Sequence, residues 1–151
     1  MTKDEINEFS KRIAQSNKTQ LVVITYEIIV NYLDSAKASE NERDFIHNLQ
    51  KAQQFLNDLI SSLDYSYELA YDLLSLYGFA NRSITKSIAR NEDCNLGTVR
   101  NMMVKLGESF EKISSEDKSG TVLKNVKPVY AGITYGKNSI NEITPPGSTY
   151  N

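Results

Sequence analysis

Residues 19–38 read TQLVVITYEIIVNYLDSAKA and contain more apolar surface than a single-faced helix needs. Between positions 21 and 33, only Thr25, Glu27 and Asn31 are polar. An ordinary surface helix has an apolar stripe a little over about 100° wide, whereas a helix that is apolar nearly all round must be covered on several sides. The stretch is also too interrupted to cross a bilayer, which takes about 20 predominantly apolar residues. We therefore expect either that this helix lies at the centre of the protein or that part of its apolar surface is exposed for binding a partner.

The bulk properties of the chain exclude several classes of protein. With 151 residues and a net charge of −2, the sequence suits one domain that has no electrostatic reason to bind nucleic acid, and no cluster of Lys and Arg contradicts this. Cys94 is the single cysteine, so a disulfide framework is excluded and a reducing compartment is the default. The N-terminus lacks the apolar core of a signal peptide. We expect a cytoplasmic protein without membrane insertion.

Helical periodicity recurs in four long segments, and no convincing strand alternation occurs before residue 120. The segments are 18–38, 41–63, 66–91 and 95–115, and a shorter helix at 3–15 could lie across the open face of the first long one. The short connections favour antiparallel neighbours, which predicts an all-α, antiparallel up-down four-helix bundle with a short N-terminal helix. The residues expected to be buried are Leu49, Leu56, Leu73, Leu76, Leu106 and Phe110.

The composition changes after residue 115, so we divide the chain into a helical bundle domain, 1–115, and a linker with a C-terminal extension, 116–151. The second part holds all three prolines and four of the seven glycines, and we expect it to be non-helical. It also carries Val126, Val129, Tyr130 and Ile133, which are unusual in an indifferent disordered tail. We expect residues near 122–143 to pack on the bundle of their own chain or of a neighbour. A flexible terminus is the alternative.

No catalytic, cofactor or metal site is expected. A di-metal bundle needs two Glu-x-x-His motifs, but the chain has one histidine, and only Asp44 and His47 stand three residues apart. No P-loop, dinucleotide-binding glycine motif or nucleophile elbow occurs. The sequence offers no case for an enzyme.

One short segment imitates the start of a calcium loop. Asn91, Asp93 and Asn95 alternate as calcium ligands do, but an EF-hand requires Gly and Glu where this chain has Leu96 and Met102. We expect a polar turn whose side chains cap the neighbouring helices.

The long segments carry, in order, motifs typical of a known family. These are LVVITYE at 21–27, YL at 32–33, AK at 36–37, QKAQ at 50–53, LD at 63–64 and LYGFANRSI at 76–84, and Phe110 stands where members of that family usually have a tryptophan. Together they resemble the flagellar secretion chaperones of the FliS family over roughly residues 16–115. The resemblance implies an antiparallel bundle that binds the C-terminal segment of flagellin in the cytoplasm and prevents its premature polymerisation before export.

This implied function agrees with the over-apolar first helix, because a bundle can bind amphipathic client helices along an apolar groove. The export apparatus is a further partner that the function would allow, and both a monomer and a homodimer remain open. The alternative is a helical adaptor or regulatory protein that binds a different helical client on the same bundle.

Candidate groove residues follow from helical faces and from the family's binding helices, with plain core packing as the alternative for each. They are Val22, Tyr26, Ile29, Leu33, Leu69, Leu73, Leu76, Tyr77 and Ala80.

Overall fold

A computed structural model describes residues 1–116, and within this range the chain forms five helices and no strand. The helices are α1 (Lys3–Gln15), α2 (Lys18–Lys37), α3 (Glu42–Ser61), α4 (Glu68–Arg90) and α5 (Leu96–Glu116). The predicted all-α class is confirmed, and each predicted boundary lies within two residues of the observed one. The expectations for the C-terminal extension lie outside the described residues.

Polar side chains fix where the helices begin. At the start of α2, the side chain of Asn17 accepts a hydrogen bond from the backbone of Gln20, and the Gln20 side chain accepts one from the backbone of Asn17. Thr2 and Glu5 form the same reciprocal pair before α1. Each pair satisfies backbone N–H groups that have no partner inside the helix. These caps explain why α1 and α2 are separate helices joined by a sharp turn.

The turn between α4 and α5 is a capping segment, as its sequence predicts. Asn91 ends α4 with a positive φ of 51°, a conformation that asparagine tolerates better than most residues. The carboxylate of Asp93 accepts a hydrogen bond of 2.9 Å from the backbone of Leu96 at the start of α5.

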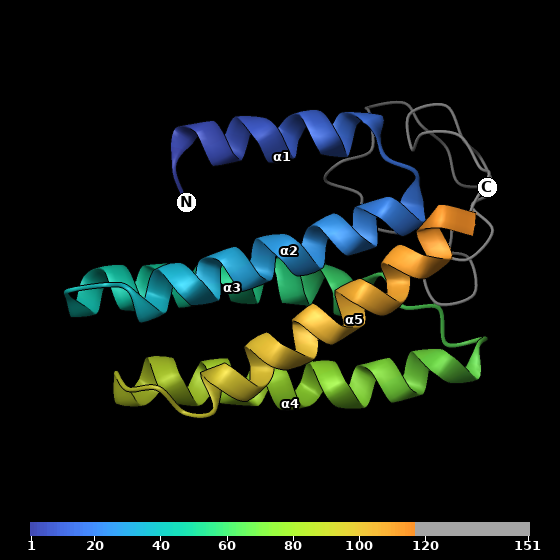
Figure 1. Cartoon of the computed structure of the whole chain (residues 1–151). Helices are drawn as coiled ribbons and strands as arrows, with labels where there is room; N and C mark the ends of the chain where they lie inside the picture. The colour runs from blue at the N-terminus through green and yellow to red at the C-terminus, as the bar shows by residue number, and fades with distance from the viewer. Residues whose placement is uncertain (117–151) are drawn as a thin grey trace.

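The four long helices form a ring in which α2 packs against α3 on one side and α5 on the other, while α4 closes the ring between α3 and α5. Successive long helices run in opposite directions, and α5 crosses the others obliquely in the view of Figure 1. The short helix α1 lies beside α2, outside this ring (Figure 1). It contributes no fully buried side chain. The bundle core therefore depends on α2 to α5.

The core confirms that α2 is central. Most of its side chains are buried, and they include polar Thr19 and Thr25. Across the middle of the ring, the hydroxyl groups of Tyr26 and Tyr77 form a hydrogen bond. The Phe110 ring packs against Tyr26, with 5.8 Å between the ring centroids. One aromatic cluster thus joins α2, α4 and α5.

Two of the six residues expected in the core are placed differently. Leu49, Leu56, Leu73 and Phe110 are buried, but Leu76 is 39% exposed and Leu106 is only half-buried. The expectation was wrong for Leu76 and Leu106 because they face each other across a hollow between α4 and α5, where the two helices do not close over their side chains.

Candidate functional site

A groove of about 600 Å³ lies between α4 and α5. Leu76 and Phe79 of α4 form one apolar wall, and Met102 and Leu106 of α5 form the other. Its polar lining residues are Thr98, Asn101, Lys105 and Ser109. All of the last four come from α5, so the groove is apolar on the α4 side and has a polar edge on the α5 side. This arrangement suits an amphipathic ligand.

Exposed apolar side chains gather beside the first half of α4. Among residues 1–116, six large apolar side chains are exposed, and all except Ile6 lie between positions 65 and 76. They are Tyr65, Tyr67, Leu69, Tyr71 and Leu76. Leu69 and Leu76 are seven residues apart and share a face of α4, so they extend the apolar wall of the groove towards the start of the helix.

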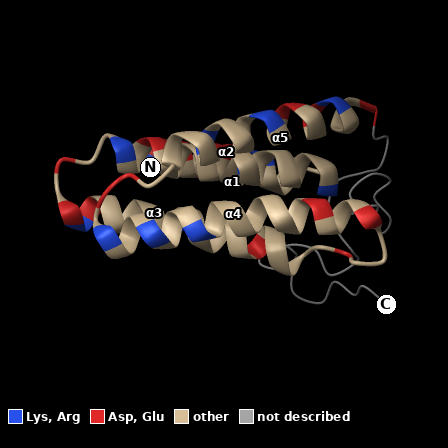
Figure 2. Ribbon diagram, turned by 90° about the horizontal axis from the view of Figure 1, so that it is seen from below, with Lys and Arg blue, Asp and Glu red and all other residues tan. Residues whose placement is uncertain are grey.

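The same half of α4 is acidic. Residues 64–81 contain Asp64, Glu68 and Asp72 and no Lys or Arg, whereas the second half of the helix carries Arg82, Lys86 and Arg90. Figure 2 shows these acidic and basic positions towards opposite ends of α4. Asp72 lies between Leu69 and Leu76 in the helix, one turn before Leu76, so a negative charge borders the apolar wall.

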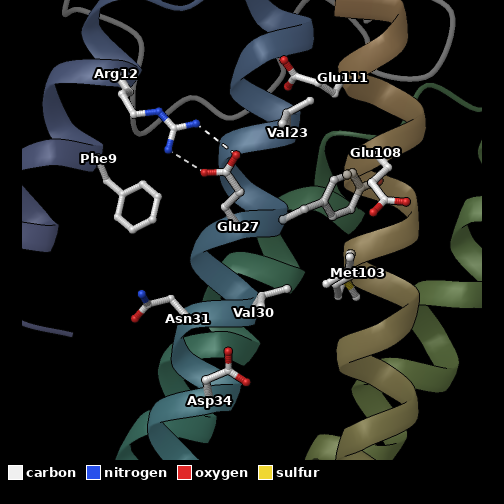
Figure 3. Close-up of a pocket in the computed structure, with 13 residues that line it drawn as sticks. Phe9, Arg12, Val23, Glu27, Val30, Asn31, Asp34, Met103, Glu108 and Glu111 are labelled. Carbon is white, nitrogen blue, oxygen red and sulfur yellow. Dashed lines mark hydrogen bonds and ion pairs between the residues drawn. The ribbon is translucent and has the colours of Figure 1, made fainter.

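A second hollow, of about 580 Å³, lies on the other side of α5, between α1, α2 and α5. Val23 and Val30 of α2 and Met103 of α5 line it, and Glu108 and Glu111 stand at its α5 edge (Figure 3). Unlike the α4–α5 groove, this cleft is partly covered by a helix of the chain, because α1 contributes Phe9 and Arg12 to its lining.

Polar contacts hold α1 over this cleft. Arg12 donates two hydrogen bonds to the carboxylate of Glu27, with distances of 2.5 and 3.0 Å (Figure 3). These hydrogen bonds raise the pKa of the Arg12 guanidinium above its usual value. Asn31 of α2 donates a longer bond of 3.4 Å to Glu5. The pKa of Glu5 is lowered, first by the hydrogen bond from the Thr2 backbone and then by the one from Asn31.

The nine predicted groove residues separate into two groups. Leu69 and Leu76 are exposed on α4. The other seven, Val22, Tyr26, Ile29, Leu33, Leu73, Tyr77 and Ala80, are buried in the core. Of the nine, Leu76 lines the α4–α5 groove and Tyr26 lines the cleft beside α1.

The sequence reasoning did not single out Phe79, Met102 or Leu106 as groove residues. Phe79 is part of the LYGFANRSI motif but lies off the apolar stripe that marked the core face of α4. Met102 directly precedes the core residue Met103 and lies on the flank of α5. The signal in the sequence was an apolar face that is wider than a core stripe on both helices. The sequence does not show that these two flanks lie opposite each other, so it does not predict the groove.

Nothing in residues 1–116 provides a metal-binding cluster of three or more His, Cys, Asp and Glu side chains. None of the five helices is both long enough and apolar enough to span a membrane. The two hollows beside α5 offer apolar walls bordered by polar and charged side chains.

One comparison with known proteins gives a match. The family described as flagellar protein FliS matches residues 3–117, a range that includes all five helices. No curated protein and no solved structure matches the chain. The matched range agrees with the extent of the bundle, and the family resemblance is confirmed. The chain belongs to the FliS family of flagellar export chaperones.

Proposed function

We propose that this protein binds the C-terminal segment of flagellin in the cytoplasm and keeps it from polymerising before export. The client would lie along the α4–α5 groove, with apolar side chains against Leu76, Phe79 and Met102. A flagellin segment covered in this way cannot pack against other flagellin molecules. Contact with the export apparatus would follow capture of the client.

The observation that carries this proposal is the exposure of Leu69 and Leu76 beside the groove. Large apolar patches on the surface of a protein mark interaction sites or aggregation hazards. Here the patch continues into a groove whose walls belong to two antiparallel helices. An amphipathic client helix binds such a groove through its own side chains at positions i, i+3, i+4 and i+7.

The client segment would be ordered only on binding. A disordered segment can cover a large surface while its affinity stays moderate, because ordering the chain costs conformational entropy. This property suits an export chaperone, which must release its client during secretion.

The buried candidates have a supporting role in this proposal. The buried candidates of α4 are Leu73, Tyr77 and Ala80, and those of α2, Val22, Tyr26, Ile29 and Leu33, are equally buried. They would shape the groove from below, while Leu69 and Leu76 make the direct contact. Substitutions in the core test stability, so the sharper test of binding uses the exposed leucines.

The test is a calorimetric titration of the intact protein with a synthetic C-terminal segment of flagellin from the same organism. Leu76→Asp should weaken binding by about tenfold or more, because burying one apolar anchor is worth about 1.5–3 kcal/mol and a carboxylate would be desolvated in its place. The fold should persist, because Leu76 is exposed in the free bundle.

Ile6→Asp is the matched control, since Ile6 is also a large exposed apolar residue but lies on α1, away from the groove. Its affinity should match that of the unmodified protein. Equal affinities for all three proteins would overturn the groove assignment, and no binding by the unmodified protein would overturn flagellin as the client.

A further inference from the structure

We propose that residues 122–130 of this chain occupy the α4–α5 groove when no client is bound. The occupant is thus the chain's own C-terminal extension. The proposed competition with a client rests on the function proposed above, whereas the docking itself does not. Three observations support this assignment: the charge of the two partners, the position at which α5 ends, and the apolar content of the extension.

The charges of the groove border and the extension are complementary. Residues 64–81 carry three acidic side chains and no basic one, and Figure 2 shows this acidic end of α4. Residues 121–141 contain Lys124, Lys127 and Lys137 and no acidic side chain. Lys105 in the groove lining opposes this attraction, and it stands on α5, across from the apolar wall of Leu76 and Phe79.

The chain leaves the described part of the bundle at the correct end. Because α4 and α5 are antiparallel, α5 ends on the side of the molecule where α4 begins (Figure 1). The helix from Met102 to Glu116 is about 21 Å long at 1.5 Å per residue. About seven residues of extended chain cover that distance. The polar residues 117–121 can reverse the chain, and residues 122–129 are then long enough to reach Met102.

The extension offers apolar side chains that match the apolar walls of the groove. Within nine residues, positions 122–130 provide Val122, Leu123, Val126, Val129 and Tyr130. A tethered segment competes at high effective concentration, so even weak contacts can keep the groove occupied. If the groove is open in about one molecule in ten, the apparent affinity for a client falls about tenfold.

Cysteine cross-linking in the full-length chain tests the docking without any client. In a Cys94→Ser background, Leu76→Cys is paired with Val126→Cys, and disulfide formation under mild oxidation is followed by mass spectrometry. The expected result is rapid cross-linking within one chain at a rate independent of protein concentration. The matched control pairs Val126→Cys with Gln54→Cys, an exposed position on α3, which lies across the ring from α5.

The control should cross-link at least tenfold more slowly. Equal rates for the two pairs would overturn the proposal, because they describe an extension without a preferred position. Cross-links mainly between chains, at a rate that rises with concentration, would also overturn it and would assign the groove to the extension of a second copy.

A charge exchange provides a second, independent measurement. Lys124→Glu together with Lys127→Glu should slow the cross-link between positions 76 and 126 severalfold, and adding Asp72→Lys should restore part of the rate. Unchanged rates in both variants would overturn the electrostatic part of the assignment. Because none of these readouts uses flagellin, they can fail while the proposed client binding stands, and the titration can fail while the docking stands.

Discussion

The two hollows that flank α5 differ in how far they are covered: α1 partly covers the cleft towards α2, whereas the groove towards α4 has no covering helix within residues 1–116. The covered cleft shows how this bundle holds an amphipathic helix. A bidentate ion pair and partly buried apolar side chains suffice, and no α1 residue is fully buried. The open groove also offers apolar walls to a ligand, with Asp72 near its α4 side and Lys105 on its α5 side.

The largest expected effect is on the free energy of unfolding. It concerns two adjacent methionines of α5, each of which lines a different hollow. Met103 lies under the covered cleft and is fully buried, so Met103→Ala should lower the free energy of unfolding by about 2–5 kcal/mol through lost burial and a cavity. Met102 lines the open groove and is only half-buried, so Met102→Ala should cost less than about 1 kcal/mol. Urea denaturation followed by circular dichroism measures both.

The same pair should reverse its order in client binding. Met102→Ala should weaken binding of the flagellin segment, whereas Met103→Ala should leave the affinity of the folded fraction unchanged. A larger stability loss for Met102→Ala than for Met103→Ala would erase the distinction between an open and a covered side.

A glycine of α5 tests how closely the covered side is packed. A Cβ atom added at Gly107 would lie 3.7 Å from the Cβ of Tyr26, which is an ordinary van der Waals contact. Gly107→Ala should therefore stabilise the protein by about 0.5–1 kcal/mol, the usual gain within a helix. Thermal unfolding measures the effect, and Gly97→Ala, with no neighbour within 4 Å, is the control. A destabilised Gly107→Ala protein would mean that α2 and α5 leave no space for a methyl group.

The smallest expected effect concerns the ion pair that holds α1. A double-mutant cycle with Arg12→Gln and Glu27→Gln should give a coupling energy of about 0.2–1 kcal/mol, because the two side chains are 39% and 42% exposed. The coupling should weaken in concentrated salt. A coupling energy that is zero at low salt would leave the apolar contacts of α1 as the whole of its attachment.

The helices could be predicted from the sequence because their causes are local. Apolar periodicity marks each buried face, and caps such as Asn17 with Gln20 mark where a helix begins. The groove could not be predicted in the same way. Leu73 and Leu76 both belong to the apolar side of α4, yet Leu73 is 3% exposed and Leu76 is 39% exposed. Their difference depends on how far α5 closes over α4, which is a property of two distant segments.

The pair of tyrosine hydroxyls at the centre of the ring fixes the axial register of its two helices. A shift of α4 along α2 by one helical turn, about 5.4 Å, would separate the hydroxyls of Tyr26 and Tyr77. Leu76 directly precedes Tyr77 in α4, so its height along the bundle is set by the same bond. A hydrogen bond in the interior thereby contributes to the position of the outer surface that a ligand meets.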